Sequence, residues 1–271
     1  MSDYSPPNLV AHTVVAGVGR VHLNDPRHRN ALSKQLSDQL AAAVTDVLDD
    51  GAAAILLTAE PPVFCAGGSL EGLLRRDVPL SASYAGYRAL IQSPVPTIAA
   101  VAGAAVGAGV NLPLACDVVI AAESARFDPR FLDVGIHPGG AHLWRLVQRV
   151  GVQGAAALAL CGDVLTGQEA RTHGLAWRCV ADADLEPTAL ALAERVTRRS
   201  APLVRRAKQT LQATVALTSF EESFALELDA QEWSVNQPEF TATVQRIQAA
   251  IAARKAADAT TSANDAANTD R

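Results

Sequence analysis

Two turns rich in glycine and alanine are the parts of this sequence that could most directly perform chemistry. The first is Phe64-Cys65-Ala66-Gly67-Gly68, and the second runs from Gly103 to Ala108. Small side chains let backbone N–H groups approach a ligand closely, and a helix that begins at such a turn adds its positive end. The two turns could therefore form an oxyanion hole, in which N–H groups stabilise a negatively charged oxygen. The alternative is that the small residues only allow a strand and a helix to pack tightly.

The polar side chains downstream of the second turn are the candidates for proton transfer. They are Asp128, Asp133, His137 and His142. We expect His137 to be the best of them, because the ordinary pKa of histidine, roughly 6.5, suits proton transfer at neutral pH. Asp128 could orient His137 or act by itself. The structural alternatives are that His137 binds a backbone carbonyl and that Asp128, which precedes a proline, is a turn or cap residue.

Other kinds of site find no support in the sequence. The glycines match neither G-x-x-x-x-G-K-[ST] nor G-x-G-x-x-G, and no H-E-x-x-H motif or Cys/His cluster is present, so we expect no metal site. A net charge of −5 argues against a nucleic-acid partner. The four cysteines form no C-x-x-C pair and the first residues do not resemble an export signal, so we expect reduced thiols and a cytoplasmic protein.

The elements that must position these residues follow from the apolar pattern. Strands are predicted at 20–23, 53–58, 97–102, 117–122 and 177–181, and helices at 31–48, 190–199, 203–211, 220–232 and 240–255. Alternation of strands and helices predicts an α/β fold with a largely parallel sheet, followed by a helical region. The apolar stretch from Ile98 to Ala122 is interrupted by glycines and Pro113, so we expect a strand, a turn and a helix that begins near Ala108, and no membrane insertion.

Considered as a set, four segments resemble the crotonase superfamily, which includes the enoyl-CoA hydratases and isomerases. They are Val21–Leu32, Phe64–Leu70, Pro96–Asp117 and Phe127–Leu146. The resemblance covers about residues 10 to 255 and implies a spiral of ββα units. With it we predict a crotonase core over 1–195, a helical region over 196–255 that forms a homotrimer or a dimer of trimers, and a disordered tail over 256–271.

The resemblance also implies a binding site for an acyl-CoA. Ala66 and Ala108 match the two residues whose N–H groups bind the thioester oxygen. Coenzyme A, as part of the substrate and not as a separate cofactor, would be held by two sets of residues. They are His28, Arg29 and Ala31, and the loop Ala66, Gly67, Gly68, Ser69 and Leu70.

At the catalytic positions the sequence departs from the family pattern. The two glutamates that act as base and acid toward a water molecule in hydratases align with Asn111 and Phe131. An aspartate found in other branches of the superfamily aligns with Gly139. Asparagine can hold a water molecule but cannot take its proton, and phenylalanine can do neither. The expected function is therefore enolate stabilisation on an acyl-CoA thioester without ordinary hydration. The alternatives are an acyl-CoA-binding or regulatory protein without catalysis, and a divergent hydrolase or decarboxylase that uses His137 or Asp128.

Overall fold

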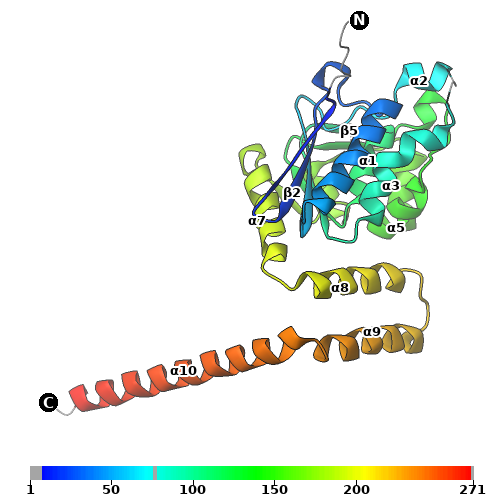
Figure 1. Ribbon diagram of the computed structural model, residues 1–271. Helices are drawn as coiled ribbons and strands as arrows, with labels where there is room; N and C mark the ends of the chain where they lie inside the picture. The colour runs from blue at the N-terminus through cyan, green and yellow to red at the C-terminus, as the bar shows by residue number, and fades with distance from the viewer. Residues whose placement is uncertain (1–7, 76–77, 270–271) are drawn as a thin grey trace, which may run out of the picture. The chain divides into compact units, whose positions relative to one another are not determined.

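A sheet of six strands lies at the centre of the first of two units, Met1–Arg205, in a computed structural model that describes residues 8–75 and 78–269 (Figure 1). The strands, in spatial order, are β1 (Val10–Val15), β2 (Val18–Leu23), β3 (Ala54–Ala59), β4 (Thr97–Val101), β6 (Val118–Ala122) and β9 (Arg178–Val180). Only β1 runs antiparallel to its neighbour. The predicted α/β fold with a largely parallel sheet is confirmed, and β1 is a strand that the sequence pattern did not predict.

A smaller sheet carries the second glycine- and alanine-rich turn. It consists of β5 (Ala104–Val106), β7 (Arg126–Asp128) and β8 (Leu165–Thr166). β5 and β7 are parallel, with Val106 opposite Asp128. The turn after β5 is therefore fixed on one side by β7.

Most helices of the first unit lie in the connections between strands, and the last two follow β9. They are α1 (Lys34–Asp49), α2 (Leu70–Arg75), α3 (Ala85–Gln92), α4 (Asn111–Ala115), α5 (His142–Ala159), α6 (Gly167–Thr172) and α7 (Leu185–Thr197), with the 3₁₀ helices η1 (Pro26–His28), η2 (Leu80–Tyr84), η3 (Gly107–Val110), η4 (Leu132–Val134) and η5 (Asp182–Asp184). α1 matches its predicted range closely. The Ser33 side chain caps it by accepting the N–H of Leu36, and its apolar residues recur every three or four positions.

The sheet is buried on both faces. On one face, Leu56, Ile98 and Ile120 pack in one cluster with Leu185 and other residues of α7. The side chains that point the other way belong to a second cluster, which includes residues of α1, α3 and α5. Figure 1 shows α7 on the opposite side of the sheet from α1 and α3. Burial on both faces explains why the central strands read as continuous apolar runs.

The apolar stretch from Ile98 to Ala122 forms a strand, a helix and a strand as the sequence indicates, but the expected turn from Gly103 to Ala108 contains the short strand β5. β4, β5, η3, α4 and β6 follow one another within it, and η3 begins at Gly107, close to the predicted start at Ala108. In the part of the chain that the structure describes, no helix combines the length and the apolar character needed to cross a bilayer.

The second unit, Arg206–Arg271, is helical. α8 (Ala201–Thr214) contains the boundary between the units, and α9 (Phe220–Val235) and α10 (Pro238–Thr269) follow. Arg206 forms an ion pair with Asp229 and lies 5.7 Å from the ring of Trp233. The boundary falls at 205/206 where the sequence suggested 195/196, and the helical backbone of α10 continues into the segment expected to be a disordered tail. Its many alanines, which favour a helix, account for that continuation.

Candidate functional site

The two glycine- and alanine-rich turns lie against each other. The backbone N–H of Cys65 donates to the carbonyl oxygen of Ala104 at 3.1 Å, and the N–H of Val106 donates to the carbonyl oxygen of Cys65 at 2.9 Å. These bonds form a parallel bridge between Cys65 and Ala105. Segments about forty residues apart in the chain therefore present their turns at one place.

Two glycines make this close approach possible. A Cβ atom on Gly109 would lie 2.4 Å from the carbonyl oxygen of Cys65, and one on Gly67 would lie 2.6 Å from that of Val106. The same atom on Gly67 would lie 3.6 Å from the backbone nitrogen of Ala108. Gly67 also has a φ of +95°, which residues with a side chain rarely adopt. Tight packing is thus one role of these small residues, and it brings Gly67 next to Ala108.

The backbone N–H groups at the two turns differ in what they bind. The N–H of Ala66 donates to the carbonyl oxygen of Arg29 at 2.9 Å, so the predicted first oxyanion donor already has a partner. For the N–H of Gly68, no hydrogen-bond partner exists among residues 8–75 and 78–269. Ala108 is the second residue of η3, where N–H groups precede the first bond within the helix. In the first turn the N–H of Gly68, and not that of Ala66, is therefore the donor without a partner among the described residues, and Ala108 remains the expected donor of the second turn.

The segment predicted to hold coenzyme A runs beside the first turn. The N–H of Leu32 donates to the carbonyl oxygen of Gly67 at 2.7 Å, and that of Ser69 donates to the carbonyl oxygen of Leu32 at 3.1 Å. The structure thus brings His28, Arg29 and Ala31 together with the loop from Ala66 to Leu70. The side chains of His28, Arg29 and Leu70 are exposed, and His28 pairs with Asp25 at 2.8 Å.

Asn30 organises this segment, a role that the sequence reasoning missed. The buried Asn30 side chain accepts the N–H of Asp25 at 2.8 Å and donates to the carbonyl oxygens of Glu60 and Val63 at 2.9 and 3.0 Å. Its φ of +52° is one that asparagine tolerates better than most residues. An asparagine shortly after the Asn-Asp-Pro turn was the available signal.

A buried pair of polar side chains lies one turn beyond the predicted second donor. Asn111 follows η3 directly, and its N–H donates to the carbonyl oxygen of Ala108. The Asn111 side chain donates through Nδ2 to the carbonyl oxygen of Gly139 at 3.1 Å. Its Oδ1 lies 2.7 Å from Nδ1 of His142. Because an amide oxygen only accepts hydrogen bonds, Nδ1 of His142 must carry the proton.

The other ring nitrogen of His142 is then an unprotonated acceptor. Nε2 is buried and has no hydrogen-bond partner within the described residues. Burial lowers the pKa of His142 to about 4, because the charged imidazolium would lose its hydration. Above that pH the ring is neutral, and Nε2 carries a free lone pair.

Aromatic rings and glycines enclose this pair. The ring of Phe131 lies 4.9 Å from the imidazole of His142, between ring centroids. A Cβ atom on Gly139 would lie 2.4 Å from the Tyr84 hydroxyl, and the hydroxyl of Tyr87 donates to the carbonyl oxygen of Gly140. Burial raises the pKa of both tyrosines, so both hydroxyls keep their protons at neutral pH.

The two predicted acid–base residues are both bonded to other groups, and Asp128 lies at the end of β7 beside the second turn. His137 is exposed, and its Nδ1 lies 2.8 Å from the carbonyl oxygen of Pro138, which is the structural alternative for this residue. The carboxylate of Asp128 accepts a hydrogen bond from Nε of Arg130 at 2.8 Å and forms an ion pair with the same guanidinium. His142, which stands just after the Pro-Gly-Gly turn, is the histidine that meets Asn111 and Phe131.

Cys65 is not available as a nucleophile. It is fully buried, its thiol donates to the carbonyl oxygen of Asn30 at 3.0 Å, and burial raises its pKa to about 12. At neutral pH the reactive thiolate is therefore almost absent. No group of three or more His, Cys, Asp or Glu side chains that could hold a metal ion occurs in residues 8–75 and 78–269.

The fold and its paired turns define a crotonase-type protein, and solved structures support this class. An enoyl-CoA hydratase from Bacillus anthracis is 28% identical, with a TM-score of 0.82 over 89% of this chain and 96% of that one. A protein from Thermobifida fusca YX, solved in complex with CoA, is 27% identical, with a TM-score of 0.77 over 84% of this chain and 93% of its own.

The sequence comparisons give the family. The model of the enoyl-CoA hydratase/isomerase family matches residues 13–249. A probable enoyl-CoA hydratase of Mycobacterium tuberculosis, EchA14, is 39% identical over 92% of this chain and 99% of its own length. The 2,3-dehydroadipyl-CoA hydratase of Escherichia coli K12 is 36% identical over 70% of this chain and 76% of its own. The chain belongs to the enoyl-CoA hydratase/isomerase family.

Proposed function

We propose that this protein binds an acyl-CoA thioester and stabilises its enolate between the backbone N–H groups of Gly68 and Ala108. The observation that carries the proposal is the bridge between Cys65 and Ala105, which holds the two turns together. Both donors are partly exposed, so a ligand can approach them. Donors fixed in advance need little rearrangement when charge develops on the oxygen, and one such donor is typically worth ~3–4 kcal/mol. The family membership and the relatives' names favour acyl-CoA as the substrate class.

In this proposal His142 is the base that accepts the proton lost by the acyl group when the enolate forms. Its neutral ring offers an acceptor lone pair at Nε2, and Asn111 positions the ring through Nδ1. Asn111 lies one 3₁₀ turn after Ala108, and residues three apart in such a helix share one face. Through Asn111, His142 is linked to the helix that carries the Ala108 donor. His137 and Asp128 have no part in this step.

Acyl-CoA binding without turnover is the second candidate, and one observation favours it. Nε2 of His142 is buried behind neighbouring side chains, and the Phe131 ring against it is only 6% exposed. If the acyl group does not reach Nε2, the site keeps its oxyanion donors but has no base.

Calorimetric titration with acetoacetyl-CoA, an acyl-CoA that enolises readily, tests the binding. Ala108→Pro removes one N–H donor and should weaken binding by about tenfold or more. Ala108→Gly keeps that donor and is the control. Equal affinities of both variants would overturn the assignment of Ala108.

Exchange of the α-protons of butyryl-CoA in D₂O separates the two candidate functions. An active base should catalyse exchange in the wild type, and His142→Gln should lower the exchange rate while affinity is retained. Binding without any exchange would favour the non-catalytic candidate.

A further inference from the structure

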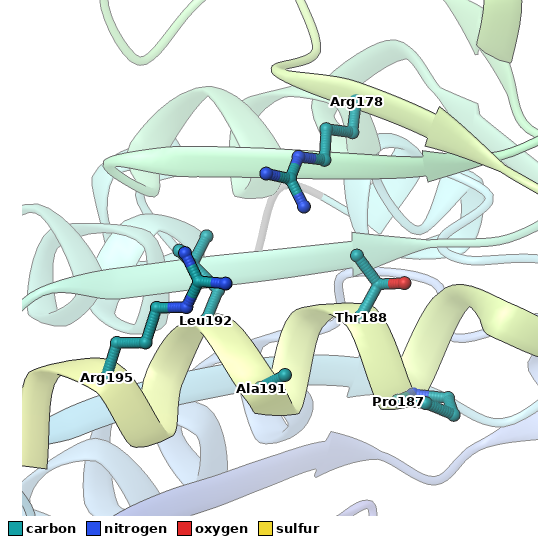
Figure 2. Close-up of a pocket in the computed structure, with 6 residues that line it drawn as sticks. All are labelled: Arg178, Pro187, Thr188, Ala191, Leu192 and Arg195. Atoms are coloured by element: carbon teal, nitrogen blue, oxygen red, sulfur yellow. The ribbon is translucent and has the colours of Figure 1, made fainter. Parts of the chain in front are cut away.

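A groove between β9 and α7 holds two arginine side chains from opposite walls. Its volume is about 290 Å³, and it is lined by Arg178, Pro187, Thr188, Ala191, Leu192 and Arg195. Figure 2 shows Arg178 extending from the strand toward the helix, with Arg195 and Thr188 directed into the same space. The groove lies on the face of the sheet that α7 covers and shares no residue with the acyl-CoA site.

Neither arginine pairs with an acidic side chain among the residues described. Within the described part of the chain, no carboxylate lies within ion-pair distance of Arg178 or Arg195. Two of the acidic residues that precede and begin α7 have partners elsewhere, since Glu186 binds Arg20 and Asp182 binds Ser124. The groove is thus a locally positive site on a chain of net charge −5.

The chemistry of the lining specifies a ligand. Guanidinium groups bind phosphate oxygens through two parallel N–H donors, which gives Arg a preference for this group. A doubly charged phosphate would also relieve the repulsion between two arginines that face one space. The hydroxyl of Thr188 offers a further donor, and Pro187, Ala191 and Leu192 offer apolar contact beside it.

We propose that this groove is a binding site for a small phosphate monoester with an apolar body. The phosphate lies between Arg178 and Arg195, and the apolar portion of the ligand contacts Leu192 and Ala191. The site is separate from the thioester site, so it binds its ligand whether or not an acyl-CoA is present.

Calorimetric titration of the full chain with phenyl phosphate and with inorganic phosphate, at constant ionic strength set with chloride, tests this proposal. Phenyl phosphate should bind more tightly than inorganic phosphate because of its ring. Arg178→Gln and Arg195→Gln should each weaken binding by about tenfold or more, since each removes a charged hydrogen-bonding partner. Arg88→Gln, which removes an exposed arginine of α3, should leave binding unchanged.

Arg178→Lys separates the shape of the guanidinium from its charge. It keeps the charge but loses the planar fork, so we expect weaker binding of both phosphates. Binding that is equal in wild type, Arg178→Gln and Arg195→Gln, or absent at millimolar phosphate, would overturn the proposal. Acetoacetyl-CoA affinity, measured on the same variants, should not change and tests the thioester site independently.

Discussion

The imidazole ring of His142 affects both the proposed function and the stability of the protein. Asn111 fixes one nitrogen as a donor, and the second nitrogen is left as a buried acceptor that no described residue of the chain bonds. A buried group of this kind is normally satisfied by a hydrogen bond, and leaving it unsatisfied costs about 1–3 kcal/mol. Such an unsatisfied group is a reason to look for a ligand or a water molecule at Nε2.

The lowered pKa of His142 predicts a loss of stability in acid. Burial holds its pKa at about 4 in the folded chain against an ordinary value of 6.5. Between these pH values the unfolded chain binds the proton and the folded chain does not. The contribution of His142 to the free energy of unfolding is therefore fully present above pH 6.5 and is lost as the pH drops toward 4. The full effect is on the order of 3 kcal/mol. Denaturant unfolding from pH 4 to 7 should show a flatter profile for His142→Gln than for wild type.

The matched control for this pH experiment is His137→Gln, because His137 is exposed and bonded to its own loop. Its profile should follow the wild type. If His142→Gln and wild type lose stability in parallel, burial of His142 is not the cause of the acid sensitivity.

The side chains at positions 111 and 131 predict very slow hydration of crotonyl-CoA. No carboxylate stands at either position, and each acid–base group typically contributes ~10²–10⁴-fold. Absorbance of the enoyl thioester should therefore decay orders of magnitude more slowly than with a two-glutamate hydratase. The double substitution Asn111→Glu and Phe131→Glu is the converse test, although a charge at buried position 131 also destabilises the fold. Fast hydration by the wild type would contradict the mechanism.

Among the elements, the contact between the two turns depends on glycine. Gly109→Ala would place a methyl group 2.4 Å from the carbonyl oxygen of Cys65, so the turns must separate. We expect a loss of about 1–3 kcal/mol in stability and weaker acetoacetyl-CoA binding. Gly72→Ala is the control, because a Cβ atom there meets Ser69 at an ordinary 3.7 Å. Thermal unfolding and calorimetry of both variants measure the two effects.

The elements themselves were predictable where a repeating apolar pattern marks them. α1, the central strands, α8 and α9 lie close to the ranges expected from sequence, whereas α7 begins earlier and α10 ends later than expected. β1 was missed because only its first residue, Val10, is buried and its residues show no apolar alternation. The helix α5 was not predicted as an element, although it carries His142 at its first residue.

The candidate site was predictable only in part, because its contacts join distant segments. The small residues of both turns indicated N–H donors, but the sequence could not show that Arg29 occupies the N–H of Ala66. In the same way, the pairing of Asn111 with His142 spans 31 positions and follows from the fold of the loop between them. Periodicity reports which face of an element is buried, and it does not report which polar atoms meet.

At the scale of the whole molecule, the helical unit predicts self-association. Phe220, Phe224 and Leu228 recur every fourth residue on α9 and are 75%, 57% and 38% exposed. Exposed apolar residues on one helix face are typical of an interface. With the family resemblance, we expect a homotrimer or a dimer of trimers, and light scattering at micromolar concentration should give that mass. The double variant Phe220→Glu and Phe224→Glu should yield a smaller species.

Removing residues 256–271 is the control for assembly, because their sequence has no apolar period to bury. The truncated chain should assemble like the full one. A monomeric wild type would refute the oligomer, and a monomeric truncation would place the interface in the last segment.

Because Cys65 lies in the bridge between the two turns, the reactivity of its thiol can be used to measure how often the site opens. Cys161 is exposed and Cys65 is buried with a thiol that ionises only at high pH. A thiol reagent should modify Cys161 at once and reach Cys65 only when the two turns separate. In a Cys161→Ser background, mass spectrometry of the peptide that contains Cys65 separates its labelling from that of the partly exposed Cys179. The labelling rate of Cys65 would then report how often the two turns separate, and a bound acyl-CoA should slow that rate.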